Sequence, residues 1–188
     1  MPAKAIRAMR GFTLIEMVIV IVVLGIALVG VSTALYPRSQ QTAEQVLSVK
    51  AAELGRAVLD EILSRNFDQQ SGPNGGLPEC VIISMQDRKN CTAPSELGDD
   101  GEMNNTEFND VDDYITTRPI SVTDVLGSDI SGEYPRFTVS VQVFYATDNN
   151  GQFSAVPATA ATHYKRIVIV IYDPQGNPYS FTAIRGNY

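Results

Sequence analysis

The feature that most constrains this chain is an apolar segment close to its N-terminus. The segment runs from Phe12 to Leu35 and carries one charged residue, Glu16. It is roughly 24 residues long, and a helix of that length reaches about 36 Å at about 1.5 Å per residue. Since the hydrocarbon core of a bilayer needs only about 20 apolar residues, the segment is long enough to cross a membrane as one helix.

The charges around the apolar segment predict its orientation. Lys4, Arg7 and Arg10 precede it, and no acidic residue does. Basic residues collect on the cytoplasmic side of membrane helices, so we expect a cytoplasmic N-terminus with the bulk of the chain on the other side. The net charge of the whole chain is -7, which argues against nucleic acid as a partner because binding to duplex nucleic acid depends on cationic side chains.

A secretory signal peptide is the alternative interpretation of the same segment. A signal peptide places its small-residue cleavage site after a shorter apolar run, whereas Gly11 comes before the run here. We therefore expect the apolar helix to be retained in the mature protein.

Glu16 is out of place in an apolar helix. An ionisable group at membrane depth costs at least a few kcal/mol unless it is paired or lies near the interface. Cleavage between Gly11 and Phe12 would create an α-amino group about one helical turn from Glu16, and charges about 4 Å apart attract by roughly 4 kcal/mol at an effective dielectric near 20. That amine can belong to the same chain or to a neighbour. Alternatively, Glu16 only complements the helix dipole, which contributes about 0.3 to 1 kcal/mol.

Residues 10–16 read Arg-Gly-Phe-Thr-Leu-Ile-Glu, and with the basic residues before them and the apolar run after them they resemble the class III leader of type IV prepilins and pseudopilins. The resemblance implies that a prepilin peptidase cleaves between Gly11 and Phe12, that Phe12 is then N-methylated, and that Glu16 is the assembly charge that registers a subunit against its neighbour. The implied partners are other pilin subunits, the prepilin peptidase, an inner-membrane assembly platform and, before assembly, membrane lipid.

The remaining chain is predicted to continue the helix and then to form a sheet. Apolar residues recur at helical spacing as far as about Phe67, and strand patterns follow at residues 80–85, 137–145, 164–172 and 179–184. We predict four parts: a removed cytoplasmic leader (1–11), a transmembrane assembly helix (12–36), an amphipathic outer half of that helix (37–67) and a β-rich globular domain beyond the membrane (68–188). The fold class is α+β, with a long N-terminal helix packed on an antiparallel sheet, as the pilin resemblance also implies.

Cys80 and Cys91 are the two cysteines of the chain. On the oxidising side of the membrane a disulfide is the expected outcome, and closing so short a loop stabilises by about 3 kcal/mol in the chain-entropy model. A redox or metal-binding pair is the alternative, although the spacing is not that of a paired metal knuckle.

Acidic residues crowd into residues 96–113, and no Lys or Arg lies between Lys89 and Arg118. Calcium takes six to eight oxygen ligands, and the candidate ligands are Asp99, Asp100, Glu102, Asp110, Asp112 and Asp113. A solvated acidic loop without metal is the favoured alternative. No other cofactor is expected.

The sequence offers little for catalysis. His163 is the only histidine, and the chain has no nucleophile elbow, phosphate-binding loop or metalloprotease helix motif. We therefore expect no enzyme.

Residues 51–55, 59–68 and 108–114 are similar to minor pilins of the mannose-sensitive haemagglutinin (MSHA) pilus. This implies a low-abundance subunit that helps to initiate or cap a pilus used for attachment, first in the inner membrane and then on the cell surface. Two alternatives stay open. One is a minor pseudopilin of type II secretion, and the other is a membrane-anchored adhesin that binds glycan through aromatic residues such as Phe108 and Tyr114.

Overall fold

The computed structural model describes residues 11–71, 80, 82, 90–98, 100–102, 104–126 and 132–188, with the side chains of 34–43 and 124 left out. Met1–Val46 and Leu47–Tyr188 form two compact units. The leader, apart from Gly11, and most of the strand expected at residues 80–85 lie outside the described residues.

The helix α1 covers Leu14–Leu63 and is 50 residues long. It runs through Pro37 and ends a few residues before the predicted position near Phe67. The reason for the early end lies in the next residues. Ser64 donates from its hydroxyl to the carbonyl of Glu61 at 2.6 Å, and Asn66 leaves the helix to form a parallel bridge with Asp110.

Four antiparallel strands form the main sheet, in the order β1-β2-β5-β6. Their bounds are Ile120–Ser121 for β1, Thr138–Tyr145 for β2, Tyr164–Tyr172 for β5 and Pro178–Gly186 for β6. The three long strands coincide with predicted ones, and β5 lies between β2 and β6, with Val141 opposite Ile169 and Ile169 opposite Phe181. The predicted α+β fold is confirmed.

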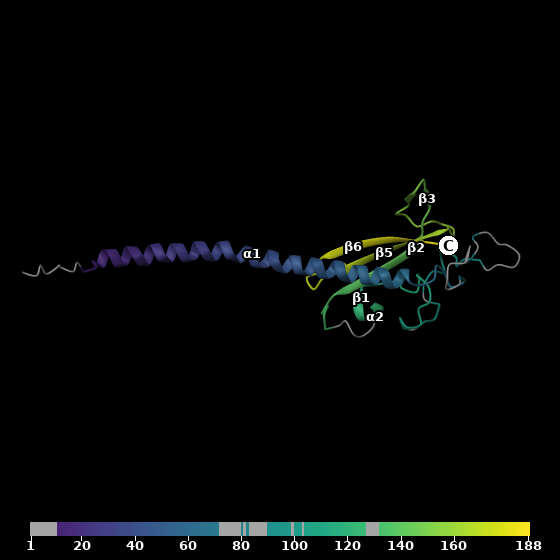
Figure 1. Ribbon diagram of the computed structural model, residues 1–188, viewed down its shortest axis with the longest axis horizontal. Helices are drawn as coiled ribbons and strands as arrows, with labels where there is room; N and C mark the ends of the chain where they lie inside the picture. Colours follow the sequence, from purple (N-terminus) through teal and green to yellow (C-terminus); the bar gives the residue numbers. More distant parts are fainter. Residues whose placement is uncertain are drawn as a thin grey trace, which may run out of the picture. The chain divides into compact units, whose positions relative to one another are not determined.

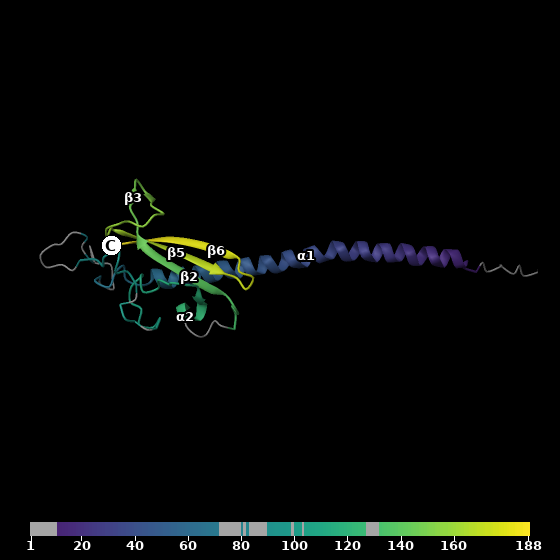
Figure 2. The same ribbon diagram turned by 180° about the vertical axis from the view of Figure 1, so that it is seen from behind.

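The part of α1 from Leu47 to Leu63 runs along one face of this sheet (Figures 1 and 2). The helix buries residues three and four positions apart, and the strands bury alternate residues, as the two periodicities require. The core contains Ala51, Leu54, Val58 and Ile62 from α1, Val139, Val141 and Val143 from β2, and Ile167, Ile169 and Ile171 from β5. Full burial of one such Val, Leu or Ile side chain contributes about 1.5 to 3 kcal/mol.

Two short elements and a hairpin complete the described part of the fold. The two-residue strand β1 leads directly into the short helix α2, Val122–Leu126. The strands β3 (Asp148–Asn149) and β4 (Gln152–Phe153) form a hairpin that projects from the main sheet (Figure 1). Its turn residues have positive φ angles, 55° at Asn150 and 83° at Gly151, which is the conformation that such tight turns require.

Gly55 lets α1 approach the sheet closely. A Cβ atom at this position would overlap the ring of Phe181, which stands on the helix-facing side of β6. No side chain larger than hydrogen fits there unless the ring moves. The glycine is therefore required by packing, although it lowers the intrinsic stability of the helix.

We predict that the sign of the stability change caused by Gly55→Ala depends on Phe181. With the ring present, overpacking of about 1 to 3 kcal/mol should exceed the helix-propensity gain of about 1 kcal/mol, so the free energy of unfolding should fall. In a Phe181→Ala background, the same substitution should be neutral or stabilising. Urea unfolding of the four proteins, followed by circular dichroism, tests this, and equal effects in both backgrounds would contradict the proposed contact.

Candidate functional site

The predicted cleavage site lies just before α1. Gly11, Phe12 and Thr13 are exposed and precede the first helical residue, Leu14. Phe12, the residue that the pilin resemblance marks for N-methylation, is 74% exposed. The peptide bond between Gly11 and Phe12 thus lies outside the helix. Its cleavage stays a prediction.

Thr13 fixes the start of the helix and thereby the position of Glu16. The backbone N–H of Glu16 donates to the carbonyl of Thr13 at 3.1 Å and lies 3.4 Å from its hydroxyl oxygen. A threonine followed three residues later by a glutamate is the spacing of a capping box, a second sequence signal for a helix start at this point. Within the part of the chain that the structure describes, the exposed side chain of Glu16 forms no ion pair, so its proposed cation has to come from elsewhere.

The first part of α1 presents an apolar surface in which Glu16 is the one charged residue. Leu14–Thr33 has a mean hydropathy of 3.0, and none of it is buried by the described chain. The two hydroxyl groups at its end bond to their own helix, Ser32 to the carbonyl of Leu28 at 2.9 Å and Thr33 to that of Gly30 at 3.0 Å. Beyond Glu16, the segment is therefore compatible with lipid or with other apolar helices on all sides.

The globular unit contains a second notable group of side chains, which we call the buried charge cluster: Asp68, Asp110, Asp112 and Lys165. Lys165 is the second residue of β5 and its side chain has no exposed surface. Its ammonium group donates to the carbonyl of Phe67 at 2.7 Å, to Asp68 Oδ2 at 3.1 Å and to Asp112 Oδ1 at 2.5 Å. The rings of Phe67 and Tyr145 lie 4.8 and 5.3 Å from it.

Asp68 ties three segments of the chain together. It follows the end of α1, and its carboxylate accepts hydrogen bonds from the backbone and hydroxyl groups of Thr92 at 3.0 and 3.1 Å and from the backbone of Gln70 at 3.1 Å. The hydroxyl of Tyr145 lies 3.2 Å from Asp68 Oδ2 and 2.8 Å from the carbonyl of Thr92. These hydrogen bonds hold the end of α1, the segment at Thr92 and β2 together at one carboxylate.

Asp110 is the least satisfied member of the cluster. It is 1% exposed, its Oδ1 accepts a hydrogen bond from the backbone of Asp112 at 2.9 Å, and its Oδ2 has no hydrogen-bond partner. Burial first, and then the charge of Asp112, raise the pKa of Asp110 to about 8. The pKa of the neighbouring Asp113 is also raised, mainly by burial. Its carboxylate holds the loop by accepting a hydrogen bond from the backbone N–H of Asn109 at 2.7 Å.

The expectation of a solvated acidic loop is therefore wrong for Asp110, Asp112 and Asp113, which are buried. The sequence pattern showed no nearby cation because Lys165 comes from a strand about fifty residues further along the chain. The role of Lys165 is not predicted either, since the sequence indicates only a strand at residues 164–172. The available signal is a lysine and an arginine, Lys165 and Arg166, at the start of a strand that is otherwise apolar.

The structure places the calcium candidates in different surroundings. Asp100 is exposed, and Asp99 lies outside the described residues. Glu102 accepts a hydrogen bond from the side-chain amide of Asn109 at 2.8 Å. Among the residues that are described, no three acidic, histidine or cysteine side chains are arranged to hold a metal ion. Calcium binding by this segment stays a prediction.

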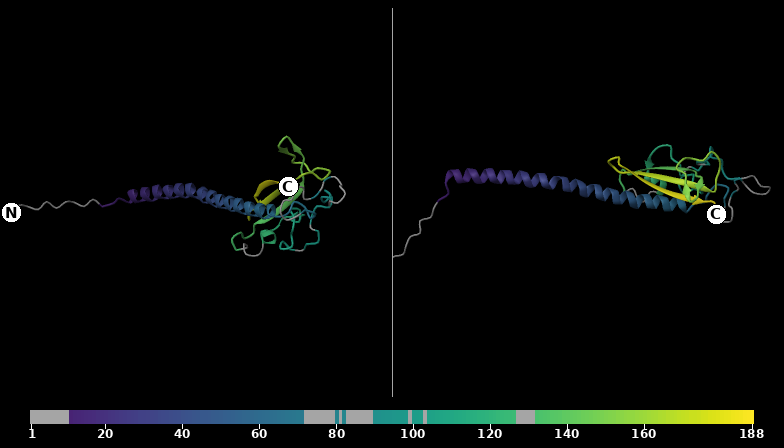
Figure 3. Two further views of the ribbon diagram at one scale, coloured as in Figure 1. Left: turned by 45° about the vertical axis from the view of Figure 1, so that its right-hand side comes forward. Right: turned by 90° about the horizontal axis from the view of Figure 1, so that it is seen from above.

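The predicted disulfide between Cys80 and Cys91 is present. It packs with Phe67 and Tyr145 in a small apolar cluster and places Thr92 next to Asp68. Asn187 donates to the carbonyl of Cys80 at 3.0 Å, so the C-terminal residues lie against the disulfide. Figure 3 shows the C-terminus at the loop end of the globular unit.

The aromatic residues considered for glycan binding belong largely to the core. Tyr114 is 1% exposed and packs edge-on against Phe108, with ring centroids 4.9 Å apart. Its hydroxyl donates to Glu61 at 3.0 Å and accepts from Arg65 at 3.0 Å. These rings do not provide an exposed stacking surface for a sugar.

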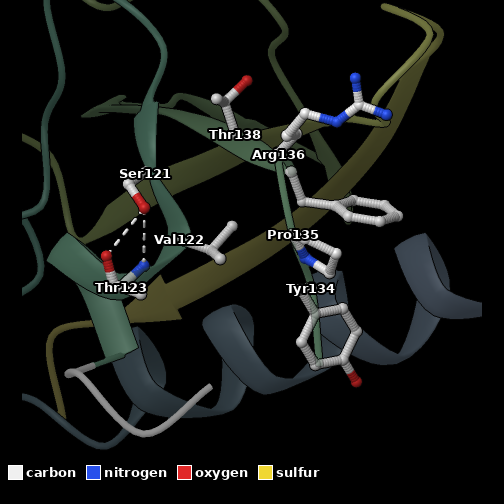
Figure 4. Close-up of a pocket in the computed structure, with 8 residues that line it drawn as sticks. Ser121, Val122, Thr123, Tyr134, Pro135, Arg136 and Thr138 are labelled. Atoms are coloured by element: carbon white, nitrogen blue, oxygen red, sulfur yellow. Dashed lines mark hydrogen bonds between the residues drawn. The ribbon is translucent and has the colours of Figure 1, made fainter. Parts of the chain in front are cut away.

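A shallow surface hollow lies beside β1 and α2 (Figure 4). Its lining residues are Ser121, Val122, Thr123, Tyr134, Pro135, Arg136, Phe137 and Thr138. The hydroxyls of Ser121 and Thr123 are 2.8 Å apart and bond to each other, and Arg136 is the only charged residue among those that line it. The hollow lacks the converging polar groups of a catalytic or ligand-binding pocket.

Comparison with known proteins supports the interpretation of the N-terminal segment. Residues 6–32 match the family model described as the prokaryotic N-terminal methylation motif. No curated protein and no solved structure gave a significant match to the chain. The prepilin-type motif supports a membrane-anchored type IV pilin or pseudopilin, which is a structural subunit processed by a prepilin peptidase and assembled with other pilins.

We predict that Asp110 makes the globular unit less stable as pH rises towards 8. Its pKa is about 8 in the folded chain and near the ordinary aspartate value of about 3.9 in the unfolded chain, so the folded form binds the extra proton between these values. Its contribution to the free energy of unfolding should therefore decrease by up to about 1.4 kcal/mol per pH unit.

Urea unfolding of the wild type and of Asp110→Asn across about pH 5 to 8 measures this contribution. Asparagine keeps an oxygen for the backbone of Asp112 but does not ionise. The wild type should lose stability relative to the variant as pH rises. Parallel profiles would show that Asp110 is not the titrating group.

Proposed function

We propose that this chain is a minor type IV pilin of the MSHA type, which is processed by a prepilin peptidase and either joins a surface pilus or primes its assembly. The observation that carries the proposal is the methylation motif at residues 6–32, which includes nearly all of the apolar span Leu14–Thr33, a span that the described chain does not bury. Attachment to surfaces is the proposed use of the pilus. The globular unit, with its sheet and disulfide, is the part that such a filament displays.

The proposed route begins in the inner membrane. The chain spans it once, with the basic leader in the cytoplasm, and the peptidase removes residues 1–11. The mature helix then leaves the bilayer and packs among the helices of other subunits, where apolar surfaces bury one another away from water. Glu16, held in the first turn by the Thr13 cap, meets the methylated amine of Phe12 of a neighbouring subunit.

We infer the MSHA system from the resemblance of three stretches of the sequence to its minor pilin D. The similar stretches are residues 51–55 and 59–68, in the second half of α1 and just beyond it, and residues 108–114, in the loop that packs on them. A minor pseudopilin of type II secretion is the competing proposal, because it shares the same leader and helix. Such a subunit would act in a short periplasmic filament.

Quantitative mass spectrometry of sheared surface filaments distinguishes these two proposals. For a minor pilin, we expect the protein in the filaments at a small fraction of the major subunit, with methylated Phe12 as its first residue. Methylated protein that is confined to the cell envelope and absent from filaments would instead indicate the secretion pseudopilin.

We predict that Glu16→Ala leaves leader cleavage intact and lowers incorporation into filaments about tenfold or more, since losing about 1.4 kcal/mol of pairing energy changes an equilibrium tenfold. Glu53→Ala, which removes an exposed carboxylate from the second half of the same helix, is the matched control and should incorporate normally. Immunoblots of sheared filaments and of whole cells give both readouts. Normal incorporation of Glu16→Ala would refute the charge-pair mechanism.

A further inference from the structure

Lys165 presents an amine to carboxyl groups in a site that excludes water. The side chains of Lys165 and Asp68 have no exposed surface and that of Asp112 has 2%. The amine lies against the rings of Phe67 and Tyr145 and within hydrogen-bond distance of both carboxylates. An ion pair in such surroundings loses its hydration, and this desolvation is costly for both charges.

The two carboxylates that touch Lys165 are not equivalent. Asp68 accepts several other hydrogen bonds, from Thr92, Gln70 and Tyr145, and these stabilise its negative charge. Asp112 has one further donor among the described residues, the backbone of Gly98, at 3.3 Å from Oδ2. The carboxyl carbon of Asp112 is therefore the better electrophile of the two.

Asp110 supplies a third carboxyl group next to the same pair. Its Oδ1 is held by the backbone N–H of Asp112 at 2.9 Å, and its Oδ2 is buried without a hydrogen-bond partner. A buried carboxyl group beside a reacting carboxyl group can donate a proton and take one back. The unused oxygen of Asp110 fits this role.

We propose that Lys165 and Asp112 condense spontaneously in the folded protein to form an intramolecular amide bond. The neutral Nζ of Lys165 attacks Cγ of the protonated Asp112, forming the C–N bond. Asp110 donates a proton to the departing hydroxyl and regains one from the nitrogen, and the C–O bond breaks with release of one water. No electrons are exchanged, and the net charge of the site is unchanged because a cation and an anion become one neutral amide.

The proposed bond fits the remaining groups of the site. Asp68 keeps its hydrogen bonds from Thr92 and Gln70, and it accepts the new amide N–H in place of the ammonium. The bond would join β5 to a loop 53 positions earlier in the chain. The disulfide between Cys80 and Cys91 fastens the adjoining segment, so two covalent links would secure the loops at this end of the sheet.

Peptide mapping of the full chain, purified in detergent and reduced, tests the proposal directly. Trypsin is expected to release residues 90–136, since Arg118 precedes a proline, and residues 137–166. We expect these two peptides as one branched species, lighter than their sum by the mass of one water, and no cleavage after Lys165. Separate linear peptides 90–136 and 137–165 would overturn the proposal.

Three variants assign the roles. Lys165→Arg should show no loss of water in its intact mass, and Asp110→Asn should form the bond at least 100-fold more slowly, the lower end for a lost proton-transfer group. Asp113→Asn, which changes the adjacent carboxylate but keeps an acceptor for the loop backbone, is the matched control and should be fully bonded. Formation of the Cys80–Cys91 disulfide shows that each variant has folded, and equal bonding in Asp110→Asn would overturn the role of Asp110.

Discussion

Much of the globular unit depends on burying one positive charge. A lysine ammonium group without water requires carboxylates and carbonyls around it, and Lys165 obtains them from the residues just after α1 and from the loop at Asp112. Through Asp68 the same charge also holds Thr92, and through Thr92 the disulfide-bonded segment. Removing the side chain of Lys165 would leave buried carboxylates without their donor, so these separate loops are expected to depend on it together.

The sequence was sufficient to predict the elements whose periodicity is strong. The apolar run and the amphipathic repeat predicted α1, and alternation or continuous apolar residues predicted β2, β5 and β6, because both patterns report local burial. The same reasoning could not place the end of α1. Its end is determined by the bridge between Asn66 and Asp110, and pairing between residues so far apart leaves no local periodic signal.

The predicted sites also divide into those that a local pattern reveals and those that only the fold assembles. Gly11, Phe12 and Glu16 form a contiguous motif that sequence alone reveals, and the family match falls on it. The buried charge cluster is assembled from the end of α1, a loop and β5, so the acidic residues by themselves predict a solvated segment, and only the fold brings Lys165 among them. The two-residue β1 and the short α2 were also unexpected, since elements of a few residues carry too little pattern to detect.

The hydroxyl groups of Ser32 and Thr33 affect whether the apolar part of α1 can move between lipid and protein in both directions. Because each already bonds to a carbonyl of its own helix, the described apolar part of α1 beyond its first turn brings no unsatisfied side-chain donor into its surroundings. Moving it from lipid to protein, or back again, exchanges one set of van der Waals contacts for another. In the proposed pilin, this part of the helix can return to the bilayer as readily as it left, so the subunit could be recovered intact when a filament is taken apart.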